Sequence, residues 1–306
     1  MSIKRSAISL LKRMLFIEQA DGLSVLYIVK RWNIRFGKYF YHSKYTTQDI
    51  IDTLRELGVS KGSNLFIHSA WDTFYNYDGD MEHLLDAIID LVGPEGTIAM
   101  PAFPIMKPGK TFNVKRTPTG AGMLPEMFRR YPGVLRSRNV RHSVCALGPL
   151  ADYLTNDHHN SKVCFDEHSP YFKICEKHFT VFSLGMPPYY IGTYQYVSQT
   201  IMRNEISYFG HFYTDKFEPI EYVDYDGEKK SYEQIVENQG FHRKSYWKGK
   251  YIVKRYFDKH KYRIRKLSNL YITAVDAHYA NEKFIELAKK GIFLYTYPFA
   301  WKIKES

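Results

Sequence analysis

The chain has 306 residues, of which 44% are hydrophobic and 16% aromatic, and its formal net charge is +11. This length and composition exclude an intrinsically disordered protein, and they allow a sizeable core in one large domain or two small ones. The basic excess favours a polyanionic partner such as nucleic acid, an anionic membrane or a phosphorylated ligand.

The first part of the chain predicts a basic amphipathic helix. Over residues 3–17, apolar side chains recur at near-helical spacing beside lysines and arginines. Lys12 and Arg13 interrupt the apolar run, so we do not expect a secretory signal. We interpret residues 1–45 as a helical extension of a domain that covers residues 46–306. The helix packs either on that domain, on a second copy of the chain as in a homodimer, or on an anionic bilayer surface.

The following segments alternate between helix and strand. A helix with a threonine cap is predicted over residues 47–57, and a short buried strand follows at 64–68. A helix at 81–92 precedes a strand at 97–101, and this order predicts a layered α/β fold. The other predicted elements are a helix at 123–130, strands at 144–148 and 180–185, a hairpin at 219–228 with an Asp-Gly turn, a helix at 280–290 and a closing strand at 292–297.

Two His-Ser pairs adjoin predicted strands. His68 and Ser69 directly follow a strand, a place where α/β folds carry ligand-binding groups, and His142 and Ser143 precede another strand. Each pair also has a structural interpretation, since a histidine at a strand end can be satisfied internally and a serine can cap a turn. Glycine-rich phosphate motifs are absent from the sequence, which disfavours dinucleotide-binding and nucleotide-hydrolase functions.

The three cysteines are Cys145, Cys164 and Cys175, and this low, odd number fits a reducing compartment better than a disulfide framework. No run of about 18 apolar residues occurs. We therefore expect a cytoplasmic protein, either free or peripheral on the inner membrane face. Cys164, His168, Cys175 and His178 invite a zinc interpretation, but their spacing does not match zinc fingers, and we expect no metal. No cysteine has an obvious partner for thiol catalysis, so acyl-enzyme chemistry is not expected.

Short segments in a fixed order carry a family resemblance. They are Leu-Gly-Val at 57–59, Asn-Leu-Phe-Ile-His-Ser at 64–69, Gly-Pro-Glu-Gly-Thr at 93–97, Met-Pro-Ala-Phe at 100–103, Gly-Met-Leu-Pro-Glu at 122–126, Pro-Gly-Val-Leu-Arg-Ser at 132–137, His-Ser at 142–143, Ala-Leu-Gly at 146–148, Ser-Pro at 169–170 and Leu-Gly at 184–185. In this order and spacing, from about Thr46 to Tyr297, the chain resembles the aminoglycoside 3-N-acetyltransferase family.

The resemblance implies a layered mixed sheet flanked by helices, with acetyl-CoA or another acyl-CoA as donor and a primary amine of an amino sugar as acceptor. It places His68, Ser69 and Ala70 where the family approaches CoA, and we add Ser143 to the expected cofactor contacts. Small side chains there would let a phosphate or pantetheine chain reach the backbone. The residues that we expect to contact the acceptor are Asp72, Glu167, His168 and Gln199.

The chain departs from the family at the expected catalytic base. The family carries Thr-x-x-His-x-x-Glu after the Leu-Gly strand, whereas this chain has Thr193, Tyr196 and Gln199 at those positions. A tyrosine with a pKa of about 10 is a poor base at neutral pH. It can still orient the amine or donate a hydrogen bond to the thioester oxygen. We therefore predict a catalytic set of His142, Tyr196 and Thr193.

Three explanations of the missing histidine stay open. Another histidine acts as base, with His142 and His168 as the candidates; or the acceptor amine is already deprotonated and positioning is enough; or transferase activity is lost and only ligand binding remains. We favour an enzyme whose acceptor is a nucleotide-linked amino sugar for surface polysaccharide. The alternative is a CoA- or sugar-binding scaffold at the cytoplasmic membrane surface. The basic residues 240–266 fit an anionic sugar nucleotide, lipid-linked sugar or membrane, and nucleic acid is not the expected partner.

Overall fold

The structure is a computed structural model that describes residues 25–192, 196–238, 240–241, 246–247 and 249–296. The chain divides into two compact units, residues 1–42 and 43–306. In the first unit, helix α2 (Val25–Phe40) has no acidic residue in its first turn and Lys38 in its last turn. The helix predicted at residues 3–17 lies outside the described residues, and the treatment of residues 1–45 as a separate extension stays a prediction. Within the described part, no helix has the length and apolar character that crossing a bilayer requires.

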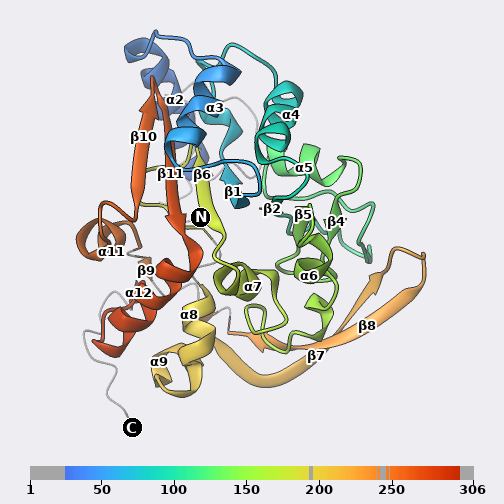
Figure 1. Cartoon of the computed structure of the whole chain (residues 1–306). Coiled ribbons are helices and arrows are strands. Elements are labelled where there is room, and N and C mark those ends of the chain that lie inside the picture. Colours follow the sequence, from blue (N-terminus) through green and yellow to red (C-terminus); the bar gives the residue numbers. More distant parts are fainter. Residues whose placement is uncertain (1–24, 193–195, 239, 242–245, 248, 297–306) are drawn as a thin grey trace, which may run out of the picture. The chain divides into compact units, whose positions relative to one another are not determined.

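The second unit is built on a seven-stranded mixed sheet (Figure 1). Its strand order is β10 (Arg263–Leu267), β11 (Leu270–Asp276), β6 (Thr180–Leu184), β1 (Asn64–Ser69), β2 (Thr97–Pro101), β5 (Val144–Leu147) and β4 (Leu135–Arg136). Strand β1 runs parallel to β2 and β6, whereas β5 is antiparallel to β2 and β11 is antiparallel to β6. The carboxyl ends of β1, β2 and β6 therefore share one edge of the sheet with the amino ends of β5 and β11.

Helices cover both faces of this sheet, as Figure 1 shows for α3 and α4 on one side and for α6 and α7 on the other. The first face packs on α3 (Thr47–Glu56), α4 (Met81–Val92) and α5 (Met123–Arg129). The second packs on α6 (Ala151–Thr155), α7 (Pro170–Glu176), α11 (Gly249–Tyr256) and α12 (Ala277–Lys289). Side chains alternate between the two faces along β1, so the core has two clusters. Leu65 and Ile67 pack in the first cluster, under α3, α4 and α5, and Phe66 packs in the second cluster on the opposite face.

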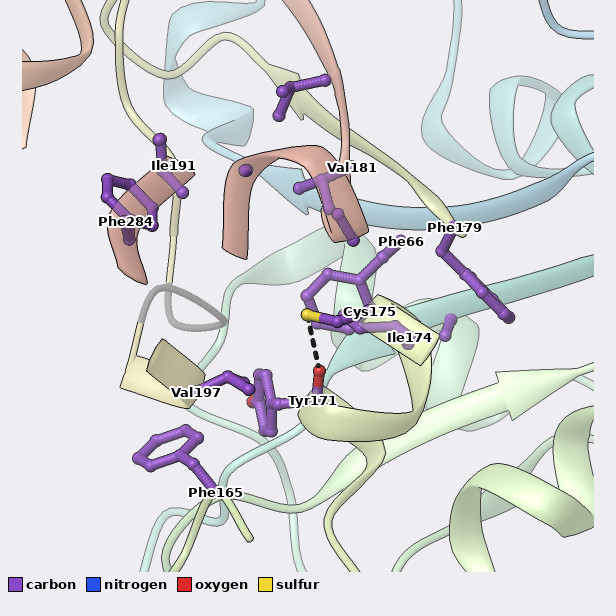
Figure 2. Close-up of a cluster of buried hydrophobic side chains, with 14 of the residues drawn as sticks. Phe66, Phe165, Tyr171, Ile174, Cys175, Phe179, Val181, Ile191, Val197 and Phe284 are labelled. Atoms are coloured by element: carbon purple, nitrogen blue, oxygen red, sulfur yellow. Dashed lines mark hydrogen bonds between the residues drawn. The ribbon is translucent and has the colours of Figure 1, made fainter. Parts of the chain in front are cut away.

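The second core cluster reaches from the sheet to the segments that carry the predicted catalytic residues. Figure 2 shows Phe66, Tyr171 and Phe165 in this cluster. The ring of Tyr171 lies 5.6 Å from that of Phe66 and 5.2 Å from that of Phe165, measured between ring centroids. A continuous aromatic contact thus links the middle of β1 to the loop that precedes α7.

Local sequence signals explain where several helices begin and end. The Thr46 hydroxyl accepts a hydrogen bond from the Asp49 amide, and the Asp49 carboxylate accepts one from the Thr46 amide at 2.7 Å, which is a capping box. Helix α4 begins after Asp80, whose carboxylate accepts a hydrogen bond from the amide of His83, and it ends at Gly93 with φ +68°. The threonine cap and the helices predicted at 47–57 and 81–92 are confirmed.

A long hairpin forms a second sheet and is visible as the curved arm of Figure 1. Strands β7 (Tyr213–Val223) and β8 (Lys229–Glu237) pair antiparallel, and the short β3 (Phe112–Asn113) adds to β7. The Asp-Gly turn lies at Gly227, with φ +86°, so the predicted hairpin is confirmed but is longer than the sequence indicated. The sequence predicts the closing strand at residues 292–297. Within the described residues 292–296, the strand is β12 (Tyr295–Thr296), which pairs with β9 (Tyr246–Trp247) and is shorter than predicted. The layered mixed α/β fold class is confirmed.

Candidate functional site

His68 lies at the carboxyl end of β1 and is only 4% exposed. Burial lowers the pKa of its imidazole to about 4, so the ring is neutral at physiological pH. Gly192, with φ +84°, covers the ring, and a Cβ atom at this position would lie 2.1 Å from His68 Nε2. That nitrogen has no hydrogen-bond partner among the residues that the structure describes. His68 is therefore a fixed, neutral group beneath the backbone of the 185–192 segment.

Ser69 is also buried, and its hydroxyl has no partner within the described ranges. The next residue ties the strand end to β6, because the Ala70 amide donates to the Leu184 carbonyl at 2.9 Å. A buried polar atom without a partner costs free energy unless a ligand or water pairs with it. The hydroxyl of Ser69 thus fits the predicted contact with a ligand, whereas the role of Ala70 toward a cofactor stays a prediction.

Ser143 differs from Ser69 because its hydroxyl is already engaged. It donates to the Ala102 carbonyl at 2.7 Å and accepts from Arg136 Nε at 3.2 Å. The guanidinium of Arg136 also donates to the carbonyl oxygens of Ala102 and Thr117 and lies 4.8 Å from the ring centroid of Phe112. Ser143 therefore holds the start of β5 in place, and its predicted contact with the cofactor stays a prediction.

His142 lies just before β5, at the same sheet edge as His68. Its backbone amide and that of Arg141 donate to Asn139 Oδ1 at 2.9 and 3.0 Å, and Asn139 is fully buried, so this turn is fixed. The imidazole is 24% exposed, and its Nε2 lies 3.8 Å from Glu237 Oε1 at the end of β8. Its ring centroid is 4.7 Å from that of Phe165. His142 thus forms a histidine–carboxylate pair that remains accessible.

Glu237 is a functional candidate that the sequence did not indicate. It stands at the far end of the hairpin, with no motif around it, and only the pairing of β7 with β8 brings it to the sheet edge. Cys164 joins the same group, because its thiol donates to Glu237 Oε1 at 3.5 Å. Cys164 is fully buried, and burial raises the pKa of its thiol well above the usual value. This is consistent with the expectation that no cysteine acts as a nucleophile.

Tyr196 begins helix α8 (Tyr196–Ile201), and its ring centroid lies 5.2 Å from that of Phe165. The structure therefore brings His142 and Tyr196 against the same phenylalanine. Gln199, one turn further along α8, is 4% exposed, and its Nε2 has no partner in the part of the chain that is described. Thr193, the third predicted catalytic residue, lies outside the described residues.

The other predicted contacts are more peripheral. His168 lies in an ionic network, with its Nδ1 3.2 Å from Asp157 Oδ2, and Asp157 also pairs with Lys173. Asp72 and Glu167 are exposed. Their roles toward an acceptor stay predictions.

The four residues whose spacing invited a zinc interpretation do not form a single site in the structure. They are Cys164, His168, Cys175 and His178. His168 pairs with Asp157, and the thiol of Cys175 donates to the Tyr171 carbonyl at 3.3 Å, as Figure 2 shows. His178 lies 3.5 Å from Asp276. Cys164 alone of the four belongs to the group around Glu237.

The fold and the sheet edge define an α/β protein with a histidine–carboxylate pair near a central strand end. At that strand end, two buried polar groups, His68 Nε2 and the Ser69 hydroxyl, find no partner among the described residues. The sequence profile described as aminoglycoside 3-N-acetyltransferase matches residues 66–250, more than half of the 306-residue chain. The chain belongs to the aminoglycoside 3-N-acetyltransferase family.

Individual curated relatives match over shorter stretches. The SPbeta prophage-derived aminoglycoside N(3')-acetyltransferase-like protein YokD of Bacillus subtilis is 30% identical over 136 residues, which cover 37% of this chain and 50% of the relative. Aminoglycoside N(3)-acetyltransferase III of Salmonella is 29% identical over 133 residues, with coverage of 37% and 46%. The chain thus spans about half the length of these curated relatives.

Solved structures match over most of the chain. The aminoglycoside acetyltransferase AAC(3)-Xa has a TM-score of 0.67 at 20% identity and covers 86% of this chain and 99% of its own. AAC-IIIb in a binary complex with CoASH has a TM-score of 0.63 at 21% identity, covering 82% and 98%. AAC-VIa bound to sisomicin has a TM-score of 0.65 at 18% identity, covering 82% and 99%. These likenesses establish the fold.

Proposed function

We propose that this chain is an acetyl-CoA-dependent N-acetyltransferase that acts on the primary amine of an amino sugar. The observation that carries the proposal is that the Ser69 hydroxyl, which has no partner among the described residues, and the His142–Glu237 pair lie at the same edge of the sheet. Family membership supports the reaction class. CoASH bound to AAC-IIIb and sisomicin bound to AAC-VIa support the two substrate classes.

His142 is the general base in this proposal. Its Nε2 lies 3.8 Å from Glu237 Oε1. In this proposal the carboxylate favours the tautomer with the proton on Nε2, and Nδ1 provides the lone pair that accepts a proton from the acceptor amine. The carboxylate of Glu237 then stabilises the imidazolium that forms. The pair takes over the task of the family's His and Glu, whose places hold Tyr196 and Gln199.

The chemical step balances without a covalent enzyme intermediate. The amine nitrogen attacks the thioester carbonyl carbon while its proton moves to His142, and the carbon–sulfur bond then breaks. CoA leaves as a thiolate and takes up a proton. Tyr196, which packs on Phe165 as His142 does, orients the amine or donates a hydrogen bond to the thioester oxygen.

The finer proposal for the acceptor is a nucleotide-linked amino sugar used for surface polysaccharide. It rests on the net charge of +11, which favours a phosphorylated acceptor over a cationic drug. Charge repulsion also disfavours a polycationic aminoglycoside at a basic protein surface.

A substrate panel tests both levels of the proposal. Release of CoA from acetyl-CoA is measured for the full chain with amino sugar nucleotides, free amino sugars and aminoglycosides. Turnover with any amino sugar supports the reaction class, and a preference for nucleotide-linked sugars supports the finer proposal. CoA release with aminoglycosides alone would overturn the finer proposal. Binding of acetyl-CoA without turnover across the panel would instead support a CoA-binding scaffold.

A further inference from the structure

Three metal-binding side chains meet beside the candidate base. Nitrogen of His142, sulfur of Cys164 and a carboxylate oxygen of Glu237 all lie within 4.8 Å of one another. They come from the turn before β5, the loop before α7 and the end of β8. Since these segments are far apart in sequence, no spacing motif reveals the group, and the sequence led to an expectation of no metal.

The distances in this group are close to those of a zinc site. Cys164 Sγ lies 3.5 Å from Glu237 Oε1, and His142 Nε2 lies 3.8 Å from the same oxygen. Tetrahedral bonds of about 2.3 Å to sulfur and about 2.0 Å to nitrogen and oxygen separate such ligand atoms by about 3.3 to 3.6 Å. The third separation, between the His142 nitrogen and Cys164 Sγ, is at most 4.8 Å, so these two side chains would have to approach each other by up to about 1.3 Å to share one ion.

The chemistry of the donors selects the kind of cation. A thiolate with an imidazole suits Zn²⁺ and related ions, whereas Mg²⁺ and Ca²⁺ prefer oxygen ligands alone. The thiolate and the carboxylate together neutralise a dication, so the buried site carries no uncompensated charge when it is filled. The Arg141 guanidinium pairs with Glu218, donates to the Ile235 carbonyl at 2.8 Å and also hydrogen-bonds the sulfur of Cys164. It can remain as a donor to the thiolate when the ion is bound.

We infer that His142, Cys164 and Glu237 form a binding site for one Zn²⁺ ion, with a fourth coordination position left open. Binding displaces the Cys164 proton, because the ion coordinates the thiolate. Coordination through His142 Nε2 moves the imidazole proton to Nδ1, which then has no lone pair to accept the proton of an amine. The loss of this lone pair predicts, on the basis of the proposed function, that the zinc-bound protein does not transfer acetyl groups.

Titration of the metal-free full chain with Co²⁺ and Zn²⁺ tests the site without reference to activity. We expect one equivalent to bind, and the Co²⁺ form to show a thiolate-to-metal charge-transfer band that added Zn²⁺ abolishes. The substitution Cys164→Ser should remove the band and weaken Zn²⁺ binding by at least about tenfold. Cys175→Ser is the matched control, because Cys175 is equally buried but lies outside the group, and it should retain both.

A second variant keeps the test decisive if Cys164→Ser does not fold. Glu237→Gln removes a partly exposed ligand and should also weaken Zn²⁺ binding while the charge-transfer band stays. Absence of stoichiometric binding to the parent chain, or a band that survives in Cys164→Ser, would overturn the metal site. Stoichiometric binding to a chain that never turns over would overturn the proposed function alone. Turnover that stoichiometric Zn²⁺ leaves unchanged would overturn the inhibitory consequence.

Discussion

Two histidines at the same sheet edge have opposite environments. His68 is enclosed beneath Gly192, has no charged partner within the described residues and has its pKa lowered to about 4 by burial. His142 is partly exposed, lies beside the carboxylate of Glu237 and packs on the buried ring of Phe165. The position of a histidine at the edge therefore does not by itself define its role.

This difference favours His142 over His68 as the proton acceptor of the proposed reaction. A base that becomes cationic needs solvent or a counter-charge. His142 has both, whereas His68 has neither among the residues that the structure describes. A neutral imidazole fixed under a backbone segment is instead suited to shaping a binding surface. The predictions that follow separate the two environments, beginning with the largest expected effect.

The close contact between Gly192 and His68 is expected to be the most sensitive feature. Gly192→Ala places a Cβ 2.1 Å from His68 Nε2 at a backbone φ of +84°, so we expect a loss of roughly 3 kcal/mol in the free energy of unfolding. Urea denaturation measures it. Gly227→Ala is the control, since its φ is +86° with no atom within 4 Å, and it should cost only about 1 kcal/mol. Equal losses would mean that His68 is not enclosed.

Acid should destabilise the fold through its buried histidines. Burial lowers the pKa of His68 to about 4 and that of His158 to about 3, both below the unfolded value of about 6.5. As the pH falls from 6.5 toward 4, the unfolded chain therefore binds protons that the native chain does not. The free energy of unfolding should drop by up to about 3 kcal/mol per histidine over that range. Above pH 7 these two histidines should make no contribution to its pH dependence.

His68→Gln removes one of these two contributions and should flatten the pH dependence of stability measured by denaturation. The control is His260→Gln at an exposed histidine, which should keep the pH dependence of stability of the parent chain. A slope that is identical in both variants would show that His68 titrates normally in the native state.

Loss of the carboxylate beside His142 should slow the reaction. Glu237→Gln keeps the shape but removes the charge that stabilises the imidazolium, so we expect kcat to fall by about tenfold with little change in the KM for acetyl-CoA. Steady-state kinetics at several pH values measure it. Glu233→Gln changes an exposed glutamate of the same strand and should leave kcat unchanged. An unaltered kcat in Glu237→Gln would remove the carboxylate from the mechanism.

Ser69 and Ser143 should respond to alanine in opposite ways. Ser69→Ala removes an unpartnered hydroxyl, so stability should stay level or rise slightly, while the KM for acetyl-CoA rises a few-fold. Ser143→Ala removes two hydrogen bonds and should cost about 1 to 2 kcal/mol of unfolding free energy. Thermal unfolding and steady-state kinetics on both variants measure the contrast. A stability loss in Ser69→Ala would assign Ser69 a structural role instead.

The sequence predicts the parts of this molecule that local patterns determine. The threonine cap before residue 47, the apolar face of residues 81–92 and the Asp-Gly turn each depend on neighbouring residues, and each appears as predicted. The His68-Ser69 strand end follows from the same local pattern.

The rest of the site depends on contacts across long sequence separations. Glu237 approaches His142 only because β7 and β8 pair into a hairpin that returns to the sheet edge, and no residue near Glu237 signals this. Phe165 joins His142 to Tyr196 through the packing of a loop that the sequence left without an assigned structure. The burial that separates His68 from His142 also depends on Gly192, far along the chain from His68.

The rate of acetyl transfer in His142→Gln, measured beside His168→Gln, tests the central claim most directly. Both variants remove a partly exposed histidine near a carboxylate, and acetyl-CoA binding is measured in each to show that the donor still binds. We predict a loss of about 100- to 10,000-fold in kcat for His142→Gln and a near-normal rate for His168→Gln. A normal rate in His142→Gln, or a large loss confined to His168→Gln, would contradict the assignment of His142 as the base.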